Sequence, residues 1–178
     1  MWKQTKIIYG RTLAVMRLDE KVIAEIHADH GANYQAVVVV YVSSLGSAVF
    51  LPGEWFTTAL FVPFRFIIWW LLGAYVIYFI GTRFLATKDT PPIDFAPLAR
   101  GIGFAMAPRI LLVFLFVVQF GLAIGWLIQI ISVVWMFAAI VTSTRISLGQ
   151  PSYTRITWIV GLAMLPVILL EPFILGQQ

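Results

Sequence analysis

The residues that could carry out chemistry are few in this sequence. Cysteine is absent from the 178 residues, which excludes disulfides, thiolate metal sites, iron–sulfur clusters and cysteine nucleophiles. His27 and His30 are three positions apart beside Asp29, a spacing that can place two metal ligands on one face of a helix. Only one carboxylate accompanies them and the sequence has no third histidine. We therefore expect solvated histidines at a membrane surface, with no metal and no cofactor.

Three ionisable residues lie within otherwise apolar segments, where a charge is costly: Arg65, Arg109 and Glu171. Arg65 and Glu171 are each predicted within roughly 10 Å of the same membrane surface, from the rise of an α-helix, and an ion pair between them would lower the cost of both. Alternatively, Pro63 begins that helix and Arg65 extends to water along its aliphatic stem. Arg109 follows Pro108, and we expect it to extend to the opposite surface in the same way.

Small residues at helical spacing mark two candidate faces for close contact between helices. Ser44 and Ala48 are one turn apart in the first apolar run, and Gly121 and Gly125 form a GxxxG pair in a later one. Such pairs are common by chance, so we expect packing within the chain rather than dimerisation. Four of the seven tryptophans are candidates to face a partner protein: Trp69, Trp70, Trp126 and Trp135.

The composition is that of a membrane protein. Of the residues, 61% are hydrophobic and only 11% are charged, whereas a soluble domain has about 25% charged residues because it needs a polar surface. The missing polar surface predicts that apolar side chains face lipid. The aromatic content of 15% fits a protein with aromatic belts at the two membrane–water interfaces.

The apolar runs predict an all-α fold, a polytopic membrane helical bundle, since a span needs about 20 apolar residues. We expect about five transmembrane helices and two regions, a cytoplasmic N-terminal segment at 1–33 and a membrane domain at 34–178. The expected spans are 34–51, 58–80, 103–118, 121–141 and 156–175, with a polar loop at 81–100.

The N-terminal segment contains one predicted amphipathic helix, from Arg11 to Asp29. Apolar residues recur there at helical spacing and gather on one face; they are Val15, Leu18, Val22, Ile23 and Ile26. The helix either packs on the protein's own membrane domain or lies in the plane of the lipid headgroups. Both alternatives place it at the cytoplasmic surface.

Lysine and arginine are distributed asymmetrically among the loops. Five lie in the N-terminal segment, three after the second span and two after the fourth, so ten of the twelve are on one side, and the short loops of the other side have none. The positive-inside rule then predicts a cytoplasmic N-terminus and an outward C-terminus in the inner or plasma (cytoplasmic) membrane. It also accounts for the net charge of +4, so we expect no nucleic acid partner.

Several segments resemble the prokaryotic branch of the Yip-domain family, relatives of the Ypt/Rab-interacting proteins. The similar segments are EIHADHGANYQAVVVVYV at 25–42, LLGAYVIYFIGTRFL at 71–85 and RGIGFAMAPRILLVF at 100–114, followed by Trp135 and Arg145. The resemblance covers residues 17–175. It implies a five-span bundle with a cytoplasmic N-terminus and no enzyme activity. The long N-terminal region of the eukaryotic members is not in this sequence, so the resemblance does not extend to binding GTPases.

Three classes of function are compatible with the sequence. The first is a non-catalytic scaffold or accessory subunit that contacts other integral membrane proteins, or copies of itself, among the membrane lipids, and that could belong to a respiratory or photosynthetic complex. The second is a small transporter or channel, which usually has broken helices or inverted repeats. The third is a membrane-embedded enzyme, for which few polar residues are available within the spans. We favour the first.

Overall fold

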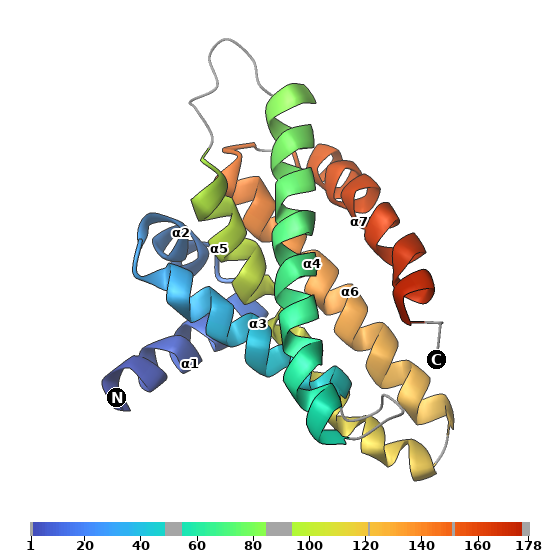
Figure 1. The fold of residues 1–178 in the computed structure, drawn as a ribbon. Coiled ribbons are helices and arrows are strands. Elements are labelled where there is room, and N and C mark those ends of the chain that lie inside the picture. The colour runs from blue at the N-terminus through green and yellow to red at the C-terminus, as the bar shows by residue number, and fades with distance from the viewer. Residues whose placement is uncertain (1, 49–54, 85–93, 121, 151, 176–178) are drawn as a thin grey trace.

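The computed structural model describes the backbone of residues 2–48, 55–84, 94–120, 122–150 and 152–175, and side chains over 4–46, 61–84, 94–114, 123–150 and 152–166. Within these residues every regular element is helical. The elements are α1 (Trp2–Met16), α2 (Glu20–Ala28), α3 (Ala32–Ala48), α4 (Trp55–Phe84), α5 (Phe95–Ala105), the 3₁₀ helix η1 (Ala107–Phe120), α6 (Leu122–Ser147) and α7 (Tyr153–Leu175). The helices form a bundle (Figure 1).

The N-terminal segment contains two helices, so the prediction of one continuous helix from Arg11 to Asp29 is wrong. The chain reverses at Leu18, which has a positive φ of 59°, between the end of α1 and the start of α2. Asp19 then caps α2, because its carboxylate accepts the backbone N–H groups of Lys21 and Val22. An Asp at this position satisfies donors that have no partner within the helix, and it restarts the helix in a new direction.

The polar loop predicted over 81–100 is wrong at both ends. Helix α4 continues to Phe84, and α5 already begins at Phe95. The predicted third span at 103–118 is in fact divided, because α5 ends at Ala105 and a 3₁₀ helix follows. Pro108 lies at this junction and has no N–H to donate, so an α-helix through this position would lack one backbone hydrogen bond. The carbonyl of Pro108 accepts the hydroxyl of Ser132 from α6 at 3.0 Å.

Three helical segments among the described residues are long and apolar enough to cross a membrane: Phe61–Phe84, Phe95–Phe114 and Ala123–Ser147. They correspond to the second, third and fourth predicted spans. The structure is therefore a helical bundle with three candidate membrane-spanning segments among the described residues, and the total of five spans stays a prediction.

Helix α5 is the packing centre of the bundle. It contacts α1, α2, α3, α4 and α6, and every residue from Leu98 to Ala105 is buried. Helix α7 packs along α4 and α6 (Figure 1), so the second and fifth predicted spans are neighbours. Among the apolar residues predicted to share a face in the N-terminal segment, Val15, Ile23 and Ile26 belong to the same core. The N-terminal helices thus pack on the protein's own bundle.

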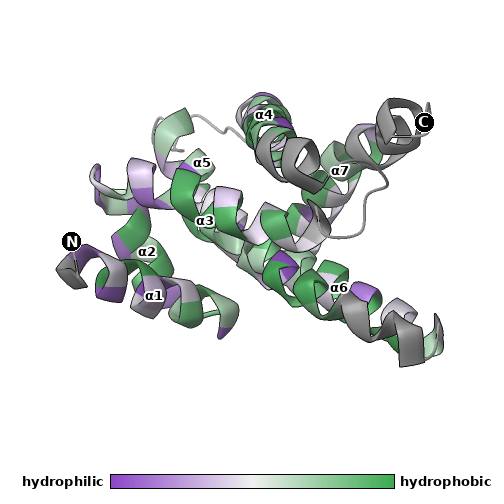
Figure 2. Ribbon diagram, turned by 60° about the horizontal axis from the view of Figure 1, so that its bottom comes forward, coloured by the Kyte–Doolittle hydropathy of each residue, from purple (hydrophilic) through white to green (hydrophobic). Residues whose placement is uncertain are grey.

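The outer faces of α4 and α6 are apolar. Hydrophilic residues gather on α1 and α2, while the coloured parts of α4 and α6 are mostly hydrophobic in this view (Figure 2). Exposed large apolar residues on these two helices are Phe61, Phe64, Ile68, Leu71, Leu72, Tyr75, Phe79 and Phe84 of α4, and Ile124, Trp126, Leu127, Ile130, Ile131, Val133 and Val134 of α6. An apolar surface of this extent indicates contact with lipid or with another protein.

Candidate functional site

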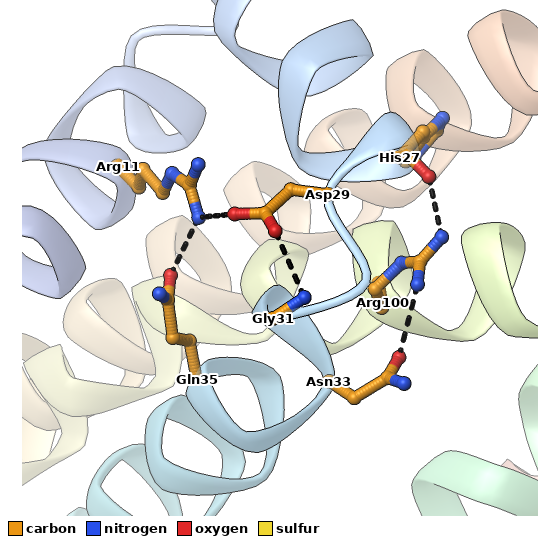
Figure 3. Close-up of polar contacts among 7 residues, drawn as sticks. All are labelled: Arg11, His27, Asp29, Gly31, Asn33, Gln35 and Arg100. Atoms are coloured by element: carbon orange, nitrogen blue, oxygen red, sulfur yellow. Dashed lines mark hydrogen bonds and ion pairs between the residues drawn. The ribbon is translucent and has the colours of Figure 1, made fainter.

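The N-terminal helices meet the rest of the bundle in a group of polar side chains around the short connection between α2 and α3. Most of the group is drawn in Figure 3. Its side chains come from α1, α2, α3, α5, α6 and the connection itself. We call it the polar cluster, and its members are Arg11, His27, Asp29, Asn33, Gln35, Arg100 and Ser143.

Arg100 reaches the connection from α5 and is only 2% exposed. Its Nη2 donates a hydrogen bond to the carbonyl of His27 at 2.5 Å, and its Nη1 donates to Oδ1 of Asn33 at 3.2 Å. A carbonyl in the last turn of an α-helix has no partner within the helix and attracts cations. Arg100 therefore completes the C-terminal end of α2 and joins it to the start of α3 (Figure 3).

Arg11 reaches the connection from α1. Its Nη1 lies 2.7 Å from Oδ2 of Asp29 and donates to Oε1 of Gln35 at 2.8 Å. The other carboxylate oxygen of Asp29 accepts the N–H of Gly31 at 2.8 Å. The bond from Arg11, then the bond from Gly31, lower the pKa of Asp29 below its ordinary value. The connection is thus held by an arginine from α1 and another from α5.

The segment Arg100-Gly101-Ile102-Gly103 allows α5 to lie close to four neighbouring helices. A Cβ at position 101 would collide with Nε2 of His27 and Oγ of Ser143. A Cβ at position 103 would lie 2.9 Å from both Cβ of Ala36 and Cζ2 of Trp70, closer than carbon atoms pack. Both positions therefore require glycine, and the close approach brings α2, α3, α4 and α6 around α5.

His27 is buried, 8% exposed, so the expectation that both histidines are solvated is wrong for this one. Its Nε2 lies 3.0 Å from Oγ of Ser143 on α6, within hydrogen-bonding distance. Burial, and to a smaller extent the charge of Arg100, lower the pKa of His27 from 6.5 to about 4. Burial disfavours the charged imidazolium, so His27 is neutral at physiological pH. His30 is exposed.

The contact between His27 and Ser143 has the spacing of a general base and a nucleophile. However, Ser143 has no exposed surface and lies against Gly101, so a substrate cannot reach its hydroxyl in this structure. The pair joins α2 to α6 instead. Among the described residues there is no group of three or more histidine or carboxylate side chains that could hold a metal ion.

A second polar contact joins α2 to α6 and α7. Oε1 of Glu20 lies 2.5 Å from Nη2 of Arg145 and accepts the hydroxyl of Tyr153 at 2.8 Å. The guanidinium of Arg145 also lies over the Tyr153 ring, 4.4 Å from its centroid, a favourable cation–π geometry. The hydrogen bonds from Tyr153 and Arg145 lower the pKa of Glu20. The first turn of α2 is thus attached to the ends of two other helices.

The predicted pair of Arg65 and Glu171 is only partly visible, because the side chain of Glu171 lies outside the described residues. Pro63 lies inside α4, which begins at Trp55, so the alternative that Pro63 begins the helix is wrong. Arg65 is half-buried. The guanidinium of Arg109 lies over the Phe66 ring, 4.2 Å from its centroid, so Arg109 is held by α4 within the bundle. Its extension to the membrane surface stays a prediction.

The four candidate tryptophans lie in different environments. Trp126 is exposed, as a residue that faces a partner must be. Trp70 is buried, and its Nε1 donates to the carbonyl of Ala99 at 2.9 Å, so its assignment as a partner-facing residue is wrong. Trp69 is half-buried. Trp135 is also half-buried, and its Nε1 donates to the carbonyl of Met16 at the end of α1, at 2.7 Å.

The predicted small-residue faces can be located for two residues. Ser44 on α3 and Gly125 on α6 are both buried within the chain, whereas Gly121 and the side chain of Ala48 lie outside the described residues. A close approach on α3 occurs at Gly46, where a Cβ would lie 3.0 Å from the backbone nitrogen of Val113 in η1. Small residues therefore bring α3 and η1 into close contact.

The polar cluster is not predicted by the sequence. The sequence pattern places Arg100 in the polar loop at 81–100 and predicts that His27 is solvated. One signal was present in RGIG at 100–103, where an arginine and two glycines precede an apolar run. Two closely spaced glycines beside an apolar run indicate close packing between helices, but they do not identify what approaches.

In comparisons with protein-family models, with curated proteins and with solved structures, nothing matches this chain.

Proposed function

We propose that this chain is a non-catalytic integral membrane protein that acts as a scaffold or accessory subunit through helix–helix contacts with other membrane proteins, in a larger respiratory or photosynthetic complex. In this proposal it crosses the cytoplasmic membrane about five times, with the N-terminus in the cytoplasm and the C-terminus outside. The resemblance to the Yip-domain family is part of the same proposal.

The observation that carries the proposal is the apolar outer face of α4 and α6. Buried polar side chains of the described bundle, such as Arg100, His27 and Ser143, bond to one another across helices. On α4 and α6, by contrast, large side chains point outward, including Trp126 at 65% exposed. Aromatic residues are enriched where membrane and protein interfaces form. A surface of this kind supports binding through shape and apolar contact.

Purification from the native membrane in a mild detergent, followed by identification of the proteins that accompany the chain, tests the role. Trp126→Ala on α6 should reduce the recovery of a partner, because aromatic residues often dominate binding energy. Trp158→Ala is the matched control, since Trp158 is 70% exposed but lies on α7. If no integral membrane protein accompanies the wild-type chain, or if both variants lose the partner equally, the docking role of α4 and α6 is wrong.

A further inference from the structure

A groove of about 750 Å³ lies between α1 and α3, apart from the polar cluster and from the outer face of α6. Its walls are mainly apolar. Ile8, Leu13 and Met16 come from α1, Val38 and Val42 come from α3, and Ile110 comes from η1. The volume is within the range of about 300–1,000 Å³ that is typical of small-molecule sites. An apolar lining of this kind selects for hydrocarbon.

The groove extends onto a membrane-spanning segment. Ile110 belongs to Phe95–Phe114, one of the three helical segments that are long and apolar enough to cross a membrane. Along α3 the lining runs from Tyr34 to Ser43, which is about 14 Å at the rise of an α-helix. In the membrane location of the proposed function, a hydrocarbon chain from the surrounding bilayer would enter the groove without passing through water.

Polar and basic groups lie beside the groove on both α1 and α3. Tyr9 and Tyr34 line the groove and are 66% and 72% exposed, a placement in which a phenol ring covers hydrocarbon while its hydroxyl meets water. Lys6 is exposed and lies one helical turn from the groove residue Tyr9, so it flanks the wall that α1 forms. Its ammonium group would attract a negatively charged headgroup.

We propose that the groove between α1 and α3 binds one acyl chain of an anionic phospholipid, with Lys6 beside the phosphate headgroup. The apolar lining recognises the acyl chain, and the cation distinguishes an anionic lipid from a zwitterionic one. The site rests on the membrane location of the proposed function but not on any protein partner. If no protein partner is found, the proposed lipid site is therefore not contradicted.

The test uses the full chain in vesicles of phosphatidylcholine that contain a minor fraction of phosphatidylglycerol with a photoreactive diazirine in its acyl chain. After illumination, labelled peptides from residues 4–16 and 34–43 should exceed those from the exposed face of α6 several-fold. Excess unlabelled phosphatidylglycerol should remove this labelling, whereas unlabelled phosphatidylcholine should not. This competition needs no variant and so does not depend on how any substitution folds.

Two pairs of variants separate the acyl and headgroup contributions. Val42→Trp fills the groove and should reduce its labelling several-fold, whereas Val133→Trp on α6 should not, although Val42 and Val133 are 46% and 45% exposed. Reversing the charge with Lys6→Glu should lower the preference for phosphatidylglycerol about fivefold. The same reversal at Arg17, which is also exposed but lies beyond the other end of α1, should leave most of the preference in place.

Three results would overturn the proposal. The first is equal labelling of the groove and of the α6 face in the wild-type chain. The second is equal labelling by the phosphatidylcholine form of the same probe. The third is a crosslink to a second copy of the chain, rather than to lipid, when a photoreactive amino acid replaces Val42.

Discussion

Acidification should destabilise this protein through one buried side chain, His27. The imidazole lies between Gly101 and Ser143, beside the charge of Arg100. In the unfolded chain the pKa is 6.5, and in the folded protein it is about 4. Above pH 6.5 both states hold a neutral ring. As the pH falls, the unfolded chain binds a proton first, so stability is lost between the two pKa values.

The size of the effect follows from these two values. Between about pH 8 and about pH 5, protonation of the unfolded state alone lowers the free energy of unfolding by about 2 kcal/mol. The loss approaches about 3 kcal/mol below both pKa values, since one pKa unit corresponds to about 1.4 kcal/mol. For a chain of this length, a loss of about 2 kcal/mol lowers Tm by about 4–8 °C. Asp29 and Glu20 have lowered pKa values, so their contribution is lost only near and below the ordinary carboxylate pKa of about 4.

Thermal unfolding in detergent, followed by tryptophan fluorescence across this pH range, measures the effect. His27→Gln removes the titrating group and can still donate to Ser143, so its Tm should vary less with pH than the wild-type Tm. His30→Gln is the matched control, because His30 is exposed and lies outside the buried contact between His27 and Ser143. A wild-type Tm that is constant between about pH 7 and about pH 5, or an unchanged slope in His27→Gln, would refute the burial argument.

Three further predictions concern packing and topology. Gly101→Ala should destabilise the protein by about 1–3 kcal/mol, because a methyl group overfills the space beside His27 and Ser143. Gly161→Ala is the control and should be neutral or slightly stabilising, because nothing lies within 4 Å of a Cβ there. Equal Tm values for the two variants would contradict the close packing at Gly101. Trp70→Phe should cost about 1–3 kcal/mol, because it removes the buried hydrogen bond from the indole to the carbonyl of Ala99 and leaves part of the core unfilled. Trp126→Phe should leave the Tm of the purified chain nearly unchanged. A larger loss for Trp126→Phe would reverse the assignment of buried and exposed rings. A cysteine at position 90 of this cysteine-free chain should resist impermeant thiol reagents applied to intact cells, and labelling from outside would invert the proposed topology.

Helical character and membrane-type composition were predictable from the sequence, because both depend on local properties. Apolar runs near 58–80 and 121–141 correspond to α4 and α6, and the missing polar surface is visible in the composition alone. The errors lie where a single residue changes the chain direction. Leu18 adopts a positive φ and Asp19 caps the next helix, which divides a continuous amphipathic pattern into two helices. The apolar periodicity is the same on either side, so periodicity could not show the break.

The polar cluster could not be predicted because its partners are distant in the sequence. Arg100 and the carbonyl of His27 are 73 positions apart, and His27 and Ser143 are 116 apart. An arginine next to an apolar run normally indicates a loop at the membrane surface, and nothing local distinguishes one that is buried. The resemblance identified RGIGFAMAPR as a landmark without assigning any role to its residues.

The contacts of the N-terminal segment make it part of the same folding unit as the membrane-type helices. Arg100 has little access to water, and its Nη groups bond to His27 and Asn33. If the segment moved away, the guanidinium would lose the carbonyl of His27 while α3 to α6 stayed packed around it. Leaving a buried charge without its partner is strongly destabilising. The predicted boundary at residue 33 therefore marks a change from polar to apolar composition. It does not divide the core, because Val15, Ile23 and Ile26 pack in the same hydrophobic cluster as Ala36.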